Sequence, residues 1–415
     1  MTKLYSRIFG LAGANALSQL FQFVLVILLA RSLGPAELGK VFIGLVLANL
    51  LFAFFDFGST TYFTRGLAKG QITQQEFLGQ FRVRVALFAL VNLAICCVGL
   101  ACENFWLVAS CSVAFTQFLF QGLQSVAKSQ IRLTNLSLGI VGDRLFCLVV
   151  IALCGASVRM SADLALLSWS AGQIFGSAFL ALRTFKKHDW SYKTPIHVAM
   201  NYRRHQHLGY FSVTNVLVTL DQAILGTISG TRQTGLFGAV SKWFVPMSLV
   251  SSSASLVVSN HSARYSSTAR EAIRDTRKVW IGMASIALAV SIGGWFISPV
   301  VDILLGSQFQ DSKQLVGFLA ISSSIIFINQ PLASLLQYFD QEKYVSKVIW
   351  ITAAIYLAVL TLVLSQFQAQ GALILAELQV GLQFSILICL MLGICRHRLV
   401  GTNSSLSTSN ENEAS

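Results

Sequence analysis

Twelve long apolar segments dominate the sequence and limit what the chain can fold into. They occupy residues 8–30, 38–57, 83–102, 104–123, 138–157, 162–182, 209–229, 235–258, 279–300, 314–336, 345–364 and 371–394. At a rise of about 1.5 Å per residue, a helix needs roughly 20 apolar residues to cross the ~30 Å hydrocarbon core of a bilayer. Strands of a transmembrane barrel are only about ten residues long. Because the bilayer core has no water to pair with backbone groups, segments of this length must form helices.

The composition supports the same conclusion. Hydrophobic residues make up 54% of the chain and charged residues 11%, whereas a soluble domain is about 25% charged. The mean hydropathy is +0.66 over the whole length. We therefore predict an all-α integral membrane protein with about 12 transmembrane helices.

The distribution of Lys and Arg between these segments predicts the orientation. If the N-terminus is cytoplasmic, the cytoplasmic connections hold 23 of the 30 cations. The opposite connections hold only Arg31, Lys40, Arg159, Arg232 and Lys313. The positive-inside rule therefore places both termini in the cytoplasm. The net charge of +13 follows from these orientation signals, so no nucleic-acid partner is expected.

The longest connection, residues 183–208, is strongly basic and divides the segments six and six. It predicts an N-terminal lobe at 1–182, a basic cytoplasmic linker at 183–208 and a C-terminal lobe at 209–395. Residues 396–415 are rich in Ser and Asn and lack an apolar face, so we expect a disordered cytoplasmic tail there.

An internal repeat supports two equivalent lobes. A Gly-x4-Gly connection at 34–39 joins the first two segments, and another at 230–235 joins the seventh and eighth, 196 positions later. Glu76 has a counterpart in Glu271. Because six is even, duplicated halves would share one orientation, related by an axis along the membrane normal. Two parallel six-helix lobes are typical of an alternating-access carrier, with a duplicated scaffold as the alternative.

Two stretches of the sequence resemble a known family. They read ARSLGPAELGKVF at 30–42, followed by FDFGS at 55–59 and Thr64-Arg65, and LDQAILG at 220–226, leading into GLF at 235–237. The stretch at 30–65 resembles the N-terminal signature of the polysaccharide transporter family. This is the Wzx-type oligosaccharide flippase branch of the multidrug/oligosaccharidyl-lipid/polysaccharide (MOP) exporter superfamily. The stretch at 220–237 resembles the start of the C-terminal lobe in that family.

The resemblance implies a V-shaped pair of six-helix bundles in the bacterial inner membrane. Such a protein flips undecaprenyl-diphosphate-linked oligosaccharide, for example an O-antigen repeat unit, from the cytoplasmic to the periplasmic leaflet. The resemblance implies no enzymatic activity and no cofactor. It suggests other polysaccharide assembly proteins, a polymerase and a chain-length regulator, as partners.

A sugar-diphosphate head needs a polar-lined cavity and cations for its phosphates. Amide side chains inside two apolar segments are candidates for that lining. They are Asn15, Gln19 and Gln22, which share one face of the first segment, and Asn329 and Gln330 in the tenth. Each of them could instead form hydrogen bonds between helices, and both interpretations stay open.

Charges inside the segments are stronger signals, because each costs about 2.5–3.5 kcal/mol near the bilayer centre. Asp221 and Lys242 flank the hairpin at 230–234 symmetrically, and we expect them to be neighbours. They could form a neutralising ion pair. Alternatively, Lys242 binds the diphosphate and Asp221 carries a coupling proton or cation. Arg144, beside Asp143 and about two turns inside the cytoplasmic end of the fifth segment, could snorkel to the interface or meet the entering diphosphate.

Two further charges have weaker assignments. Arg31 lies at a helix end, where anchoring is the usual role, and is a further candidate substrate cation. Glu377 in the last segment is a candidate for ion coupling, together with Asp143 and Asp221. No metal site is predicted, because the cysteines and histidines lack ligand spacing.

Two other functions compete with a flippase. An exporter of small amphiphilic cations from the same superfamily would want acidic cavity residues without compensating cations, whereas this chain offers Lys242 and Arg144. A membrane glycan polymerase or glycosyltransferase would need paired carboxylates or a metal-binding Asp-x-Asp on a sizeable loop. The connection around 301–313 is too small for such a site.

Overall fold

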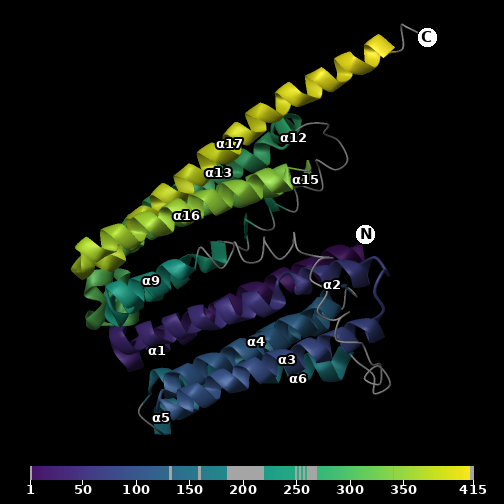
Figure 1. Ribbon diagram of the computed structural model, residues 1–415. Coiled ribbons are helices and arrows are strands. Elements are labelled where there is room, and N and C mark those ends of the chain that lie inside the picture. The colour runs from purple at the N-terminus through teal and green to yellow at the C-terminus, as the bar shows by residue number, and fades with distance from the viewer. Residues whose placement is uncertain are drawn as a thin grey trace. The chain divides into compact units, whose positions relative to one another are not determined.

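The computed structural model describes residues 2–129, 133–157, 160–184, 219–247, 269–339 and 341–411, together with positions 250, 251, 254, 255 and 258. Every regular element in these residues is a helix (Figure 1). Contacts group the chain into two compact units. The first unit comprises Met1–Lys242, Asp302–Gln310 and Phe367–Gly371, and the second comprises Trp243–Val301, Asp311–Gln366 and Ala372–Ser415.

The described part of the first unit contains eight α-helices. They are α1 (Thr2–Asp56), α2 (Ser59–Ala68), α3 (Gln74–Ala101), α4 (Phe105–Ser129), α5 (Leu133–Ser157), α6 (Ala162–Thr184), α9 (Leu220–Ile228) and α10 (Thr231–Ser241). The 3-10 turn η3 (Lys242–Phe244) follows α10 directly. Phenylalanine rings of α3 and α4 form much of its core: Phe88 meets Phe118 edge-to-face at 5.1 Å, and Phe81 stacks on Phe118 at 5.9 Å.

A break at Gly34 divides α1 into two helices. Gly34 has φ 72° and ψ 175°, a backbone conformation that glycine adopts readily and other residues do not. Pro35 then occupies the first turn of the second helix, where its missing N–H leaves no helical hydrogen bond unmade. The 44 residues of α1 between Gly13 and Asp56 would otherwise extend for about 66 Å, twice the bilayer core.

Nine described helices are long and apolar enough to cross a membrane. Because α1 contains the two predicted segments 8–30 and 38–57, the nine helices correspond to ten of the twelve predicted segments. The segments 209–229 and 235–258 are described only in part, by α9 and α10. An all-helical membrane protein is therefore confirmed, and the count of twelve stays a prediction.

The two glycines that begin the repeated motif have similar backbone conformations. Gly230, the counterpart of Gly34, precedes α10 with φ 87° and ψ 167°. The helices that follow these two glycines cross where Gly39 faces Gly235. A Cβ on Gly39 would overlap the carbonyl oxygen of Thr231, and a Cβ on Gly235 would overlap that of Pro35. Two equivalent positions thus make the same contact in both directions, as at a local two-fold axis.

The second unit contains α12 (Ala269–Asp275), α13 (Arg277–Ile297), α15 (Lys313–Tyr338), α16 (Glu342–Gln366) and α17 (Gly371–Glu411). Met283 and Ala287 of α13 pack on Phe327 of α15 in its core. Three short elements, α14 (Val300–Leu305), η4 (Ser307–Ser312) and η5 (Gln368–Gln370), connect long helices along the chain, and most of their residues belong to the first unit.

Two predicted segments, the linker at 183–208 and the tail at 396–415, can be set against these elements. The linker 183–208 lies outside the described residues beyond Thr184, so the lobe boundary stays a prediction. At the other end, α17 continues to Glu411, through the segment expected to be a disordered tail. Extending an existing helix avoids the nucleation that an isolated segment needs, and the disordered tail at 396–415 stays a prediction.

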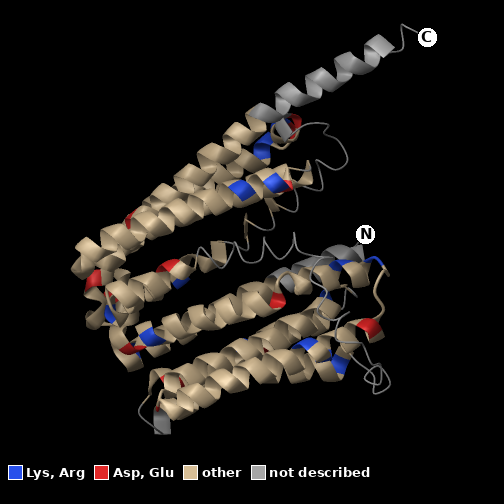
Figure 2. Cartoon of the chain, in the orientation of Figure 1, with Lys and Arg blue, Asp and Glu red and all other residues tan. Residues whose placement is uncertain are grey.

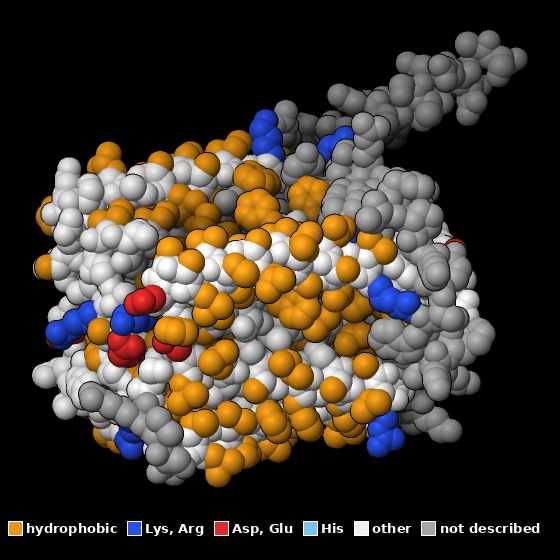
Figure 3. All heavy atoms as spheres, turned by 60° about the horizontal axis from the view of Figure 1, so that its bottom comes forward, with side chains coloured by type: hydrophobic (Ala, Val, Ile, Leu, Met, Phe, Trp, Pro, Cys, Tyr) orange, Lys and Arg blue, Asp and Glu red, His pale blue; other side chains and the backbone are white. Residues whose placement is uncertain are grey.

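The exposed surface is that of a membrane protein. Leu90, Leu93, Leu153 and Leu362 each expose more than 60% of their surface. Figure 3 shows one face on which hydrophobic side chains cover the helices, with Lys and Arg toward its margins. Most charges likewise lie near the ends of helices (Figure 2). Exposed apolar surface of this extent is stable against lipid and would aggregate in water.

Candidate functional site: an intramembrane charge cluster

Arg144 lies deeper than the sequence suggested. It is eleven residues after Leu133 and thirteen before Ser157, at the middle of α5, instead of about two turns from the helix end. The difference arises because α5 begins five residues before the apolar segment that marked it. Arg144 is therefore about 16 Å from the start of the helix and about 20 Å from its end, a depth that makes snorkelling to the interface harder than the sequence suggested.

Asp143 is held against α6 behind Arg144. Its side chain is 2% exposed, and its Oδ2 lies 3.5 Å from Arg144 Nε. The backbone approach depends on Gly172 of α6, where a Cβ would come within 2.5 Å of the Asp143 carbonyl oxygen and 2.9 Å of its Oδ1. In the described part of the chain, Asp143 Oδ1 and Arg144 Nη1 are buried without a hydrogen-bond partner. The pair is therefore incompletely satisfied.

Lys242 reaches the same region from another part of the sequence. It follows α10 directly, eleven residues after Thr231, so its depth from the hairpin is about 16 Å. Its charge interacts electrostatically with both Arg144 and Asp221. Asp221, in the first turn of α9, is 1% exposed and accepts a hydrogen bond from the Gln222 N–H. This interaction is consistent with the predicted proximity of Lys242 and Asp221, which stays a prediction.

Asp143 and Arg144 are paired, and Lys242 interacts electrostatically with Arg144 and Asp221. We call Asp143, Arg144, Asp221 and Lys242 the charge cluster. Its acids and cations differ in access. Both aspartates are buried, whereas the Arg144 side chain is 20% exposed and Lys242 is half-buried. The two acids are therefore more buried than the two cations.

Two aromatic residues that the sequence analysis did not single out complete the cluster. The Trp169 ring of α6 lies 4.5 Å from Arg144 Cζ, and the Phe42 ring of α1 lies 5.8 Å from Lys242 Nζ. Cation–π contacts of this kind stabilise a desolvated cation by about 1–2 kcal/mol. A sequence signal existed for Phe42, since it follows the repeated glycine motif by three residues, and none for Trp169.

Arg31 lies elsewhere and has structural partners. Its Nε donates to the Leu304 carbonyl at 2.9 Å, and a terminal nitrogen donates to that of Ile303 at 2.5 Å. These carbonyls belong to the last turn of α14, where a cation satisfies unpaired acceptors and complements the helix dipole. The contacts match the anchoring interpretation.

The amide candidates are divided between the two units. Asn15, Gln19 and Gln22 are half-buried on α1. Asn329 of α15 is buried and donates to the Gln383 carbonyl at 2.9 Å and to its Oε1 at 3.1 Å. That contact is a hydrogen bond between α15 and α17, which matches the interhelical interpretation. Gln330, beside it, is half-buried.

The remaining candidate, Glu377, is exposed on α17 in the second unit and is not part of the charge cluster. Among the described residues, no three His, Cys, Asp or Glu side chains gather as metal ligands.

Comparison with known proteins places the fold. No family model and no curated protein sequence matches the chain. Among solved structures, an inward-facing multidrug resistance MATE family transporter of the MOP superfamily matches with a TM-score of 0.68 and 13% identity over 94% of this chain and 96% of that one. The lipid II flippase MurJ in an inward closed conformation matches with a TM-score of 0.70 and 12% identity over 94% and 87%. A MOP superfamily transporter from Pyrococcus furiosus, described as having a binding pocket of reverse polarity, matches at 0.60 and 13% over 95% of both chains.

These matches cover nearly the whole chain at low identity, and they show the fold. The chain has the all-helical architecture that MATE transporters and MurJ share within the MOP superfamily. The structural neighbours named here are transporters. Their substrates differ, so the choice of substrate for this chain depends on its own residues.

Proposed function

We propose that this protein is an alternating-access flippase of the polysaccharide transporter family. It moves undecaprenyl-diphosphate-linked oligosaccharide from the cytoplasmic to the periplasmic leaflet of the bacterial inner membrane. The observation that supports the proposal is the electrostatic interaction between two partly exposed cations, Arg144 and Lys242, each of which also interacts with a buried aspartate, Asp143 and Asp221 respectively.

Like charges in a low-dielectric region repel strongly, so two neighbouring cations there are unfavourable without anions. The two aspartates supply part of that compensation. A diphosphate bound at the exposed part of the Arg144 and Lys242 side chains supplies more, through charge-assisted hydrogen bonds. Binding is then strongest for a substrate with two adjacent negative groups.

The planar guanidinium of Arg144 suits a phosphate better than an ammonium would, because it donates two parallel hydrogen bonds. Trp169 fixes its plane by stacking on one face. Lys242 contributes a mobile point charge. The arrangement therefore supplies one oriented contact and one adaptable contact for the two phosphates.

The sugars of such a substrate need neutral hydrogen-bonding groups. Asn15, Gln19 and Gln22 repeat on one face of α1 and remain half-buried, which is consistent with contact to a polar ligand. We keep them as candidate sugar contacts. We assign Asp221 to ion coupling, because it interacts with Lys242 and is placed to respond when Lys242 engages a phosphate.

An exporter of small amphiphilic cations is the second candidate. The MATE-like fold favours it, and so does the unpartnered buried Oδ1 of Asp143. In that case Asp143 and Asp221 would bind the substrate, and the two cations would oppose it.

Transport by the purified chain in proteoliposomes separates the two candidates. The probes are a fluorescent short-chain polyprenyl-diphosphate disaccharide, whose flipping is followed by dithionite bleaching, and a fluorescent organic cation. We expect flipping of the diphosphate lipid, and a loss of at least about tenfold in Arg144→Met and Lys242→Met, since each removes a charge-assisted contact. Lys40→Met is the matched control, because Lys40 is exposed and paired only with Glu37.

The conservative variant Lys242→Arg should retain most of the activity. Transport of the organic cation, abolished by Asp143→Asn and unaffected by Lys242→Met, would overturn the proposal in favour of the second candidate. Flipping of the diphosphate lipid at equal rates in all variants would remove the charge cluster from the mechanism.

A further inference from the structure

Two cysteines on neighbouring helices of the first unit are in contact. The side chains of Cys96 in α3 and Cys111 in α4 are joined by a hydrogen bond. Cys111 is buried, whereas Cys96 is partly exposed. No residue of the charge cluster belongs to either helix. The two thiols therefore form a reactive pair that the transport site does not use.

The packing of α3 against α4 sets this contact. Only residues 102–104 separate the two helices, so they form an antiparallel hairpin. Gly99 faces Val108, where a Cβ on the glycine would lie 3.1 Å from Val108 Cγ2. Cys96 is three residues before Gly99 and Cys111 is three residues after Val108, so the same helix faces bring the two thiols together. The contact thus follows from the register of the hairpin.

The half of α3 that carries Cys96 has little apolar packing against α4. Nearer the start of the helix, Phe81 and Phe88 both contact an aromatic ring of α4. Beyond Phe88, the buried residues of α3 are Asn92 and Gly99, which bury little apolar side-chain area. A covalent link at Cys96 would therefore hold the half of α3 that packing holds least.

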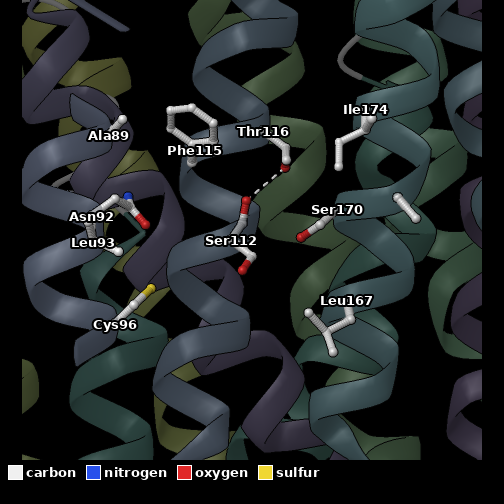
Figure 4. Close-up of a pocket in the computed structure, with 11 residues that line it drawn as sticks. Ala89, Asn92, Leu93, Cys96, Ser112, Phe115, Thr116, Leu167, Ser170 and Ile174 are labelled. Atoms are coloured by element: carbon white, nitrogen blue, oxygen red, sulfur yellow. Dashed lines mark hydrogen bonds between the residues drawn. The ribbon is translucent and has the colours of Figure 1, made fainter. Parts of the chain in front are cut away.

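Cys96 can be reached from the bilayer. It lines a groove between α3, α4 and α6, and Figure 4 shows its sulfur directed from α3 toward α4. The side chains of Leu93 and Ile174 at the groove are 61% and 54% exposed, so a small lipophilic molecule has access from the hydrocarbon. The orientation that the cations predict places the connection between α3 and α4 on the non-cytoplasmic side, where disulfides persist.

We propose that Cys96 and Cys111 are a modification site, where a reversible disulfide links α3 to α4. A disulfide requires Cβ atoms about 3.5–4.5 Å apart, and two hydrogen-bonded thiols on closely packed helices need only small movements to join. The link is independent of the charge cluster and of the substrate that the transporter moves.

The oxidant is a small lipophilic disulfide, and the link forms in two exchange steps. The Cys96 sulfur loses its proton and attacks one sulfur of the oxidant, whose S–S bond breaks and releases one thiol with that proton. The Cys111 sulfur then loses its proton and attacks Cys96 in the mixed disulfide, which releases the second thiol. Two electrons and two protons pass from the cysteines to the oxidant.

Oxidation of the purified full chain in phosphatidylcholine nanodiscs tests the site. The reduced protein is treated with dithiodipyridine, the remaining thiols are blocked with N-ethylmaleimide, and the peptides are mapped without reductant by mass spectrometry. We expect a peptide cross-linked through Cys96 and Cys111, which dithiothreitol separates. The oxidised protein should melt several degrees above the reduced protein, because the link constrains the unfolded chain.

Three variants make the result specific. Cys96→Ala and Cys111→Ala should each abolish the cross-link and the dependence of the melting temperature on oxidation. Cys96→Ala should fold normally because its position is partly exposed, so the test does not depend on the buried Cys111. Cys97→Ala is the matched control, since Cys97 is adjacent and exposed, and it should leave both readouts unchanged.

Pyridylthio adducts that persist on both Cys96 and Cys111 would overturn the proposal, because they would mean that the two sulfurs cannot meet. A cross-link through Cys97 or Cys102 instead would also overturn it, and so would a melting temperature that oxidation does not change. Flipping of a diphosphate lipid is measured separately, and none of these outcomes bears on it.

Discussion

Gly39 and Gly235 lie face to face at a crossing of two helices, where each would place a Cβ 3.0 Å from the backbone nitrogen of the other. The same relationship holds in both directions, and the two residues are 196 positions apart in the sequence. Close approach of this kind is available only to small residues, and it is a common way to pack helices in membranes. The crossing joins the hairpin of one repeat to that of the other.

Gly39→Ala and Gly235→Ala should each destabilise the protein by about 1–3 kcal/mol or more, because the new methyl group would overlap a backbone carbonyl that cannot rotate away. Thermal unfolding of the purified protein in detergent measures the effect. Gly282→Ala is the control, since nothing lies within 4 Å of its Cβ position. An unchanged melting temperature in Gly39→Ala would contradict the crossing.

Changes at Lys242 and Asp221 distinguish an ion pair from a binding site. Lys242→Met removes the positive charge near the buried Asp221, so the abundance of the protein in the membrane should fall. The double variant Lys242→Met/Asp221→Leu removes both charges and should restore the abundance. We expect the restored protein to remain defective in surface glycan, because repacking does not replace a cation. Immunoblotting and glycan staining measure the two quantities. Normal glycan in a well-expressed double variant would assign the pair a structural role only.

The hydrogen bond between Asn329 and Gln383 predicts a structural role for both side chains. Asn329→Leu should lower stability by about 1–3 kcal/mol, since Gln383 Oε1 is left buried with one donor fewer. Asn329→Leu/Gln383→Leu should recover much of that loss. Melting temperatures of the single and double variants provide the measurement, and transport rates serve as an additional readout. Recovered stability with transport still abolished would favour the cavity-lining role instead.

The orientation is tested by labelling single cysteines in a background without the eight native ones. Lys69→Cys, Lys187→Cys and Arg270→Cys should resist a membrane-impermeant maleimide in intact cells and react after permeabilisation. Thr231→Cys, on the opposite side of the membrane, should react in intact cells. The reverse pattern would invert the topology that the positive-inside rule predicts.

Removal of residues 401–415 should leave transport and membrane abundance unchanged. The segment has a polar composition without an apolar face, so it has little to contribute to packing. Surface glycan in cells that express the truncated chain is the measurement. A large loss of glycan at normal abundance would mean that the segment has a function of its own.

The sequence by itself determined the membrane class and most of the helices. Apolar segments of about 20 residues have one stable conformation in a bilayer, because backbone polar groups must be paired within the segment. The connection between two helices at Gly34 was also predictable from the sequence, because the backbone preferences of Gly followed by Pro are local and need no tertiary contact. The repeated glycine motif even marked, 196 positions apart, the two residues that meet at the crossing.

Only the tertiary structure decided which of the isolated charges come together. Arg144 and Lys242 are 98 positions apart, and nothing local to either residue reveals the other. Their proximity depends on how α5, α9 and α10 pack on α1, and on the absence of a side chain at Gly172. Helix formation is a local response to the bilayer, whereas the pairing of polar groups depends on long-range packing that no short stretch of sequence encodes.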